Sequence, residues 1–230
     1  MITNLNWNYK TKYKYYLVDT IPSTNTYLKD NCDEYPDKTI LIALQQTAGR
    51  GRYERKWRSD KDIMFSILLK KNGNYEITTP LAICNALDKY GFDAGIKWPN
   101  DVYLNNKKLC GILIEDVFQN KFKASIIGIG INMTDKESVS GIGLNCNIDK
   151  YELINNIMNE FDSLNKLEHD ELINLYRKRS IIIGKNVYYQ DNLYLAIDID
   201  IDGHLILKNE NNTITVSSDE INIKESLRWK

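Results

Sequence analysis

The pattern of apolar and polar residues predicts a β-rich first half of the chain. Several short runs combine β-branched side chains with flanking turn residues, which is typical of buried or half-buried strands. The expected strands cover residues 13–18, 39–45, 63–69 and 122–131. Gly128 and Gly130 weaken the last of these strands unless a ligand or another backbone lies against them.

Residues 97–115, KWPNDVYLNNKKLCGILIE, predict a β-hairpin at the centre of the chain. Asn105 and Asn106 separate two strand-like runs, and asparagine tolerates the positive φ that a two-residue hairpin turn requires. Counting outward from that turn, alternation places four side chains on one face. These are Asp101, Tyr103, Lys108 and Cys110. A carboxylate and an ammonium would then lie beside Gly111, where a ligand can approach the backbone, so an anion and its metal could be held there.

Helical spacing of apolar residues predicts helices that cover the sheet. Thr79 and Pro80 supply an N-cap and a first helical residue, and Gly91 supplies a C-terminal stop. Apolar stripes indicate two more helices, within residues 151–164 and 172–176. Together with the strands, these helices predict an α+β domain.

After the last of these helices the pattern changes to short strands separated by turns, such as Asp202-Gly203. The expected strands cover residues 186–189, 193–199, 204–208, 213–216 and 221–223. Closely spaced short strands of this kind are typical of a small antiparallel barrel. We therefore expect two domains, residues 1–180 and 181–230, of which the second is a small β-barrel.

Charge and cysteine content narrow the classes of function. The chain has 30 Lys and Arg residues and 31 Asp and Glu residues, which gives a formal net charge of -1 at pH 7. This balance provides no overall field for capturing nucleic acid or an anionic membrane, so any phosphate has to be bound locally. The cysteines are irregularly spaced and include no C-x-x-C pair, which indicates neither a zinc site nor a disulfide framework. With no long apolar run in the sequence, we expect a cytoplasmic protein without a membrane span.

A basic loop, QTAGRGRYERKW at residues 46–57, follows the second expected strand. Arg50 and Arg52 alternate with glycines, so the loop can wrap an anion with bidentate guanidinium groups. A solvated surface loop is the alternative, but Trp57 favours binding because its ring offers a surface for stacking. The loop is not a dinucleotide fingerprint, because Glu54 stands where the third glycine is required.

Ser23, Thr24 and Asn25 precede a short predicted helix. All three are favoured helix-capping residues, which is a purely structural explanation for their presence. A helix start also offers backbone N–H groups and side-chain hydroxyls to a small polar ligand. The pattern alone leaves both explanations open.

These motifs, in this order, closely resemble those of the biotin protein ligases. The resemblance rests on STN at 23–25, QTAGRGR at 46–52, RKW at 55–57, KWPNDVYL at 97–104, KKLCGILIE at 107–115 and GIGINM at 128–133. It covers most of the chain, and it implies an α+β fold. That fold has a mixed-sheet catalytic domain of the class II synthetase-like, biotin–lipoate ligase type and a small C-terminal SH3-like β-barrel.

The resemblance also implies a two-step activity. Biotin and Mg²⁺-ATP give biotinyl-5'-adenylate and pyrophosphate, and the adenylate then acylates one lysine of the biotin carboxyl carrier domain of a carboxylase. The implied biotin contacts are Ser23, Thr24, Asn25, Gln46, Arg50, Gly51, Arg52, Lys108 and Gly111. The implied ATP contacts are Trp57, Lys97, Asn100, Asp101 and Asn132. The implied catalytic residues are Arg50, Arg52, Asp101 and Lys108, with Asp101 serving Mg²⁺.

The charge pattern agrees with this chemistry, because a carboxylate attacking an α-phosphate needs cations where negative charge develops. Three departures from the family pattern stand out. Tyr53-Glu54 intervenes where many relatives carry a second glycine-bearing turn, and Cys110 replaces a small residue. Few residues precede Ser23, so we expect no DNA-binding helix-turn-helix domain and no repressor function.

Two other functions stay open at this stage. One is a biotin-binding or adenylate-binding module without catalysis, and the other is a ligase for lipoate or another acyl group. Incubation with biotin, Mg²⁺-ATP and a carrier domain distinguishes them. Formation of a homodimer through the sheet is also left open.

Overall fold

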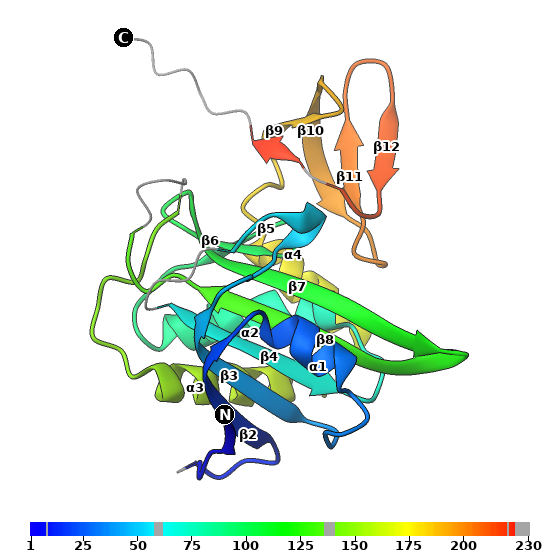
Figure 1. Cartoon of the computed structure of the whole chain (residues 1–230). Coiled ribbons are helices and arrows are strands. Elements are labelled where there is room, and N and C mark those ends of the chain that lie inside the picture. Colours follow the sequence, from blue (N-terminus) through cyan, green and yellow to red (C-terminus); the bar gives the residue numbers. More distant parts are fainter. Residues whose placement is uncertain (8, 58–61, 136–140, 220, 224–230) are drawn as a thin grey trace.

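A mixed eight-stranded sheet forms the body of the protein in the computed structural model (Figure 1). The structure describes residues 1–230 except 8, 58–61, 136–140, 220 and 224–230. The strand order is β1-β2-β3-β4-β8-β7-β6-β5, and only β2 and β3 pair in parallel. The bounds are β1 Ile2–Asn4, β2 Lys14–Ile21, β3 Thr39–Gln46, β4 Ile63–Leu69, β5 Gly95–Lys97, β6 Asp101–Leu104, β7 Lys107–Gln119 and β8 Lys121–Ile131.

Helices cover both faces of this sheet. They are α1 Thr24–Asp30, α2 Tyr75–Asp88, α3 Lys150–Leu164 and α4 His169–Arg179. Leu28 of α1 packs with Ile126 on one face, whereas Phe65 packs with residues of α2, α3 and α4 on the other. Strand β4 is buried along its whole length, which explains its continuous apolar run. Within the described part of the chain, no helix has the length and apolar character needed to cross a bilayer.

Helix α2 begins earlier than the sequence predicts. The pattern places its start at Thr79 and Pro80, whereas the helix begins at Tyr75 and contains Pro80 in its interior. Tyr75 and Ile77 are buried in the core, and this packing offsets the backbone hydrogen bond that proline cannot donate. Gly91 follows the helix with φ +79°, the left-handed conformation that suits its predicted role as the stop.

The central hairpin turns at the predicted residues. Asn105 and Asn106 have φ values of 50° and 60°, as a two-residue hairpin turn requires. Tyr103 lies opposite Lys108, also as predicted. The turn chemistry therefore fixes the first pairs of the hairpin.

A bulge changes the register beyond those pairs. Leu109 is an extra residue on β7, so Val102 pairs with Cys110 and Asp101 pairs with Gly111. The prediction that Asp101 faces Cys110 is therefore wrong. Cys110 is fully buried, and its pKa is raised because burial disfavours the thiolate.

The C-terminal residues form a second, five-stranded antiparallel sheet in the order β12-β11-β10-β9-β13. Its strands are β9 Asn186–Tyr189, β10 Asn192–Ile199, β11 Leu205–Lys208, β12 Thr213–Val216 and β13 Asn222–Ile223. All five overlap the predicted strands. The expected SH3-like barrel is not closed in the described residues, because β12 and β13 lie at opposite ends of the sheet. The domain boundary after residue 180 stays a prediction.

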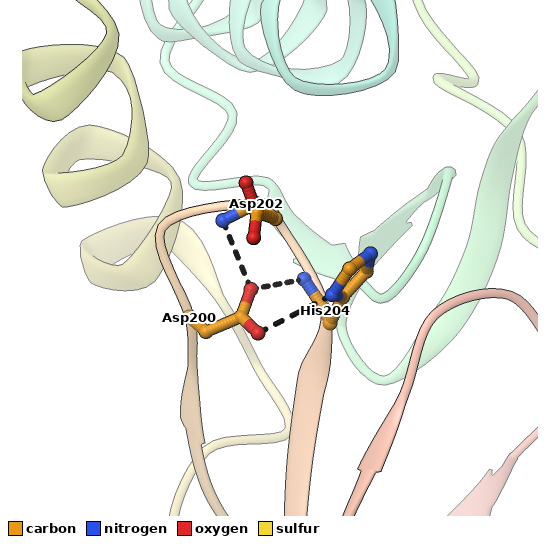
Figure 2. A group of neighbouring side chains, drawn as sticks. All are labelled: Asp200, Asp202 and His204. Carbon is orange, nitrogen blue, oxygen red and sulfur yellow. Dashed lines mark hydrogen bonds and ion pairs between the residues drawn. The ribbon is translucent and has the colours of Figure 1, made fainter.

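The turn between β10 and β11 is closed by an aspartate (Figure 2). Asp200 accepts hydrogen bonds from the backbone N–H groups of Asp202 (3.0 Å) and His204 (2.8 Å), and its carboxylate pairs with His204 Nδ1 at 3.3 Å. The three side chains have metal-ligating atoms within 4.8 Å of one another. Closure of the turn already accounts for their arrangement. The same turn contacts α4, because Ile201 O lies 2.5 Å from Nε2 of His169.

Candidate functional site

One cavity of ≈ 910 Å³ lies where several segments of the chain meet. The start of α1, the loop after β3, the turn before β6, strands β7 and β8 and the segment after β12 all contribute to its walls. The predicted residues that line it are Ser23, Thr24, Asn25, Gln46, Arg50, Gly51, Arg52, Trp57, Lys97, Asn100, Asp101, Lys108 and Gly111. Motifs far apart in the sequence are thus brought to one site.

The start of α1 forms one wall of this cavity. Ser23 Oγ accepts a hydrogen bond from the Thr26 backbone at 3.3 Å, so it caps the helix as its sequence position predicts. Thr24 Oγ1 lies 2.7 Å from Ser66 Oγ, and the Thr24 backbone N–H donates to Gln46 Oε1 at 2.7 Å. These hydrogen bonds fix the wall while Ser23, Thr24 and Gln46 also line the cavity. The structural and the ligand-facing explanations are therefore compatible.

Lys108 and Asp101 form an ion pair at the mouth of the hairpin. Lys108 Nζ lies 2.7 Å from Asp101 Oδ1, and both side chains are partly exposed to the cavity. The bulge at Leu109 returns Gly111 to the same face, where a Cβ would lie 3.4 Å from Lys108 Nζ. The predicted carboxylate, ammonium and glycine are therefore neighbours, although the register that brings them together was not predicted.

Asp101 fits a magnesium ion that arrives with a nucleotide. Mg²⁺ prefers oxygen ligands and is commonly bound by one or two carboxylates together with substrate phosphates. Asp101 supplies one such carboxylate beside the cationic residue Lys108. Within the described chain, the metal-ligating cluster with three members lies elsewhere, at Asp200, Asp202 and His204. The donor set at Asp101 thus suits a shared ion better than a resident one.

Glycines form the floor of the cavity, and the protein's own side chains lie on them. Gly111 pairs with Gly130 across β7 and β8. A Cβ at Gly130 would stand 2.4 Å from Cε2 of Trp57, and one at Gly128 would stand 2.7 Å from Oδ1 of Asn25. Side chains, Trp57 and Asn25, approach these glycines closely, where the sequence led us to expect a ligand or another backbone.

Two polar atoms in this region have no hydrogen-bond partner among the described residues. They are the indole Nε1 of Trp57 and Oδ1 of Asn25, and both are buried. An unpartnered buried polar atom costs about 1 to 3 kcal/mol, so each such atom calls for an explanation. A ligand that offers one acceptor and one donor would satisfy both.

The basic loop folds back on itself at the entrance. Gly51 N–H donates to Arg55 O at 2.7 Å, and Trp57 N–H donates to Gly49 O at 2.9 Å. Between them Tyr53 has φ 54°, an uncommon value for a residue with a Cβ. This is the position where the Tyr53-Glu54 departure occurs, and it gives the loop a tight turn.

Arg52 joins the loop to two other segments. Its Nη1 donates to Asn100 Oδ1, and its Nη2 donates to Ser218 Oγ, both at 3.2 Å. Asn100 in turn donates to Ile112 O on β7. The guanidinium therefore connects the loop, the turn before β6 and the C-terminal sheet at the rim of the cavity.

The predicted ATP contacts Lys97 and Asn132 differ in their position relative to the cavity. Lys97 lines the cavity, and its Nζ lies 3.4 Å from the hydroxyl of Tyr103. Asn132 does not line the cavity; its side chain donates to Lys108 O at 3.2 Å behind the bulge. A contact between Asn132 and a nucleotide stays a prediction.

Sequence reasoning missed other residues at the site. Ser66, Thr134, Asp135, Asp219 and Ile221 line the cavity without belonging to a recognised motif. Glu115 lies behind the wall and pairs with Lys29 and Arg50 at 3.0 Å and 2.8 Å. Its signal was available in the sequence, because it is a charged residue that ends an otherwise apolar stretch.

The sequence matches known proteins over much of its length. Residues 17–132 match the model of the biotin/lipoate A/B protein ligase family. The bifunctional ligase/repressor BirA of Bacillus subtilis is 35% identical over 111 residues, which are 44% of this chain and 34% of that protein. The biotin--[acetyl-CoA-carboxylase] ligase of Mycobacterium tuberculosis is 29% identical over 214 residues, which are 80% of this chain and 79% of that protein.

The fold of this chain matches that of a solved protein structure. The biotin protein ligase from Aquifex aeolicus in complex with biotin and ATP superposes with a TM-score of 0.77 at 23% identity, covering 94% of this chain and 100% of that one. At this identity the likeness concerns the fold, and the chain spans only about a third of the Bacillus subtilis relative. The family match covers half of the chain, and the chain therefore belongs to the biotin/lipoate A/B protein ligase family.

Proposed function

We propose that this protein is an ATP-dependent biotin protein ligase. It activates biotin as biotinyl-5'-adenylate and transfers the biotinyl group to one lysine of a biotin carboxyl carrier domain. The observation that carries the proposal is the placement of Arg50, Arg52 and Lys108 around one cavity together with the polar start of α1. Relatives support it, because they include a biotin--[acetyl-CoA-carboxylase] ligase and a biotin protein ligase in complex with biotin and ATP.

In the first step a carboxylate oxygen of biotin attacks the α-phosphorus of ATP. A C–O–P mixed anhydride forms, the bond to the bridging oxygen breaks, and pyrophosphate leaves. Two anions approach each other in this step, so cations held in place before the reaction lower the barrier. Lys108 and Arg52 are the groups we assign to the reacting carboxylate and phosphate. Asp101, together with the nucleotide phosphates, would hold Mg²⁺, which supplies further charge neutralisation when bound.

In the second step the ε-amine of a carrier lysine attacks the acyl carbon of the adenylate. An amide bond forms, AMP leaves with the electron pair of the broken bond, and the amine loses a proton. The protein needs no nucleophile of its own. Arg50 and Arg52 lie on the loop that would retain the adenylate until the carrier docks.

The orphaned amide oxygen of Asn25 favours biotin over lipoate. The ureido ring of biotin carries N–H donors, whereas the dithiolane ring of lipoate carries none. Oδ1 of Asn25 is buried and has no partner among the described residues. A ureido N–H can satisfy this acceptor, and leaving it unpaired would cost affinity for lipoate.

Incubation with biotin, Mg²⁺-ATP and an apo carrier domain, followed by intact-mass measurement, tests the function. The expected result is one biotinyl addition per carrier domain and release of pyrophosphate. A parallel reaction replaces biotin and its carrier with lipoate and a lipoyl domain. Mass gain only in that reaction would support a ligase for lipoate. Biotin binding with no pyrophosphate and no mass gain would show a binding module.

Three organisational features belong to the same proposal. Residues 1–180 act as the catalytic domain and 181–230 as a separate C-terminal domain. Copies of the chain pair through the large sheet, whose end strands are β1 and β5. The protein acts in the cytoplasm, in agreement with its four free cysteines, Cys32, Cys84, Cys110 and Cys146.

A further inference from the structure

Among the contacts described, Glu115 is the one acidic side chain that accepts hydrogen bonds from both α1 and the basic loop. It lies on β7 opposite Ile126 of β8, and its side chain is 16% exposed. Its Oε1 accepts from Lys29 Nζ at 3.0 Å, and its Oε2 accepts from Asn25 Nδ2 and Arg50 Nη2, both at 2.8 Å. Three segments of the chain are therefore joined at one carboxylate.

The bond to Asn25 sets the direction of that amide. A carboxylate only accepts hydrogen bonds, so the NH₂ group of Asn25 has to point toward Glu115. The same Nδ2 also donates to Leu113 O, at the longer distance of 3.4 Å. The amide oxygen then lies against Gly128, where a Cβ would stand only 2.7 Å away. Oδ1 is buried without a partner among the described residues, and both Asn25 and Gly128 line the cavity. The bond to Glu115 thus turns the acceptor of Asn25, and not its donors, toward Gly128.

The bond to Arg50 holds the basic loop against the sheet. Arg50 Nη2 and Asn25 Nδ2 share the same oxygen, so the loop and α1 are held in a fixed relation. Arg50 is 39% exposed and has little packing of its own to restrain it. Without the carboxylate its guanidinium would be free to move into solvent, and the rim of the cavity would lose that restraint.

Glu115 remains charged in this setting. Burial by itself raises the pKa of its carboxyl group, but hydrogen bonds from Lys29, Asn25 and Arg50 outweigh that effect and leave the pKa below its usual value. The acceptor state of the carboxylate is therefore maintained through the neutral pH range.

We infer that Glu115 is a positioning residue for biotin specificity: it holds Asn25 with its amide oxygen toward the cavity and holds Arg50 over the rim. The inference rests on the proposed function and deepens it. A ligand with an N–H group at the floor, such as the ureido ring of biotin, meets a fixed acceptor there. A ligand without one, such as lipoate, leaves that acceptor buried and unpaired.

The test measures biotin binding by calorimetry and adenylate formation by pyrophosphate release, with biotin and ATP varied separately. In Glu115→Gln an NH₂ group replaces one carboxylate oxygen. This group cannot accept the hydrogen bonds that the oxygen accepted, so the amide of Asn25 is no longer held in one orientation. We expect at least tenfold weaker biotin binding and a matching rise in the KM for biotin. The KM for ATP should stay within about twofold.

Glu160→Gln is the matched control. Glu160 also pairs with a lysine, Lys89 at 2.8 Å, and accepts from an amide, Asn85 at 3.4 Å, but it lies on α3 outside the cavity. A general loss of an ion pair would affect both variants, whereas loss of positioning affects biotin in Glu115→Gln alone. Glu115→Asp keeps the charge and should recover part of the biotin affinity, and it also serves if Glu115→Gln does not fold.

The outcomes separate the two proposals. If the wild-type protein binds no biotin, the proposed function fails and this inference fails with it. If the wild type binds biotin and Glu115→Gln binds it equally well, only the positioning role is overturned. Equal weakening of biotin and ATP, or no recovery in Glu115→Asp, would also overturn it, because both results indicate a loss of structure rather than of orientation.

Discussion

The indole Nε1 of Trp98 donates a hydrogen bond to the backbone oxygen of Gly203, 2.9 Å away. Trp98 is 2% exposed and lies in the turn between β5 and β6, next to the cavity residue Lys97. Gly203 lies in the turn between β10 and β11, which Asp200 closes. The C-terminal sheet is thus joined directly to the segment that carries part of the site.

Trp98→Phe should destabilise the protein by removing this donor from the half-buried carbonyl of Gly203. A hydrogen bond of this kind contributes about 1 kcal/mol. Trp7→Phe is the control, because Nε1 of Trp7 has no partner among the described residues. Urea unfolding of both variants measures the difference. An equal or smaller loss at Trp98 would mean that the contact contributes little.

Much of this fold follows from local sequence signals. Strand β4 is recovered with its bounds because it is a short run of buried apolar residues, Ile63–Leu69. The hairpin turn at Asn105 and Asn106 follows equally from the φ values that asparagine tolerates. Helix α2 was misplaced at its start because packing of Tyr75 overrides the local signal from Pro80.

What the sequence could not show depends on contacts between distant segments. The bulge at Leu109 is invisible to alternation, because a single extra residue shifts the face of every position beyond it. The role of Glu115 depends on α1 and the basic loop meeting at one strand, and no local pattern records that meeting. Family motifs located the cavity residues, but only the folded chain shows that Trp57 and Asn25 fill the space above Gly130 and Gly128.

Lys108→Ala should nearly abolish adenylate formation and leave the fold intact. Lys108 lies at the cavity beside Asp101 and outside the apolar core, so its removal takes a cation from the reacting groups. Loss of one charge contact held in place for the transition state costs roughly 3 to 4 kcal/mol, or about two to three orders of magnitude in rate. Pyrophosphate release is the measurement. Lys107→Ala, one residue away and exposed, is the control; equal rates for all three proteins would contradict the assignment.

Gly130→Ala and Gly128→Ala should affect different substrates. The new methyl group at Gly130 would stand 2.4 Å from the ring of Trp57, and the one at Gly128 would stand 2.7 Å from Oδ1 of Asn25. We assign Trp57 to the adenine and Asn25 to biotin, so the first variant should weaken ATP and the second should weaken biotin. Calorimetry with each ligand separately measures this. The same loss of both ligands in both variants would show that the glycines serve only packing.

The stability that Glu115 contributes should depend on pH in a defined direction. Its pKa in the folded chain lies below the ordinary value, so the ionised carboxylate favours the folded state. The contribution is fully present above the unfolded pKa of about 4.3 and is lost as the pH falls through the lower folded value. Urea unfolding of wild type and Glu115→Gln should therefore give a constant difference from pH 6 to about 8 that shrinks in acid, by the linkage relation. A difference that grows as the pH falls would contradict the sign.

Arg52→Gly should release the adenylate before transfer. The guanidinium joins the basic loop to Asn100 and to Ser218, so it ties the rim of the cavity to two other segments. Its removal leaves Lys108 for the first step but weakens closure of the loop over the mixed anhydride. The escaped adenylate should then acylate exposed lysines of any protein nearby.

Incubation with biotin, Mg²⁺-ATP and an unrelated lysine-rich protein should give diffuse biotinylation that wild type does not produce. Thr47→Gly changes the same loop at an exposed residue that does not line the cavity, so it controls for loop flexibility alone. If the bystander protein stays unlabelled while adenylate synthesis continues, Arg52 does not retain the intermediate and the loop closes by other contacts.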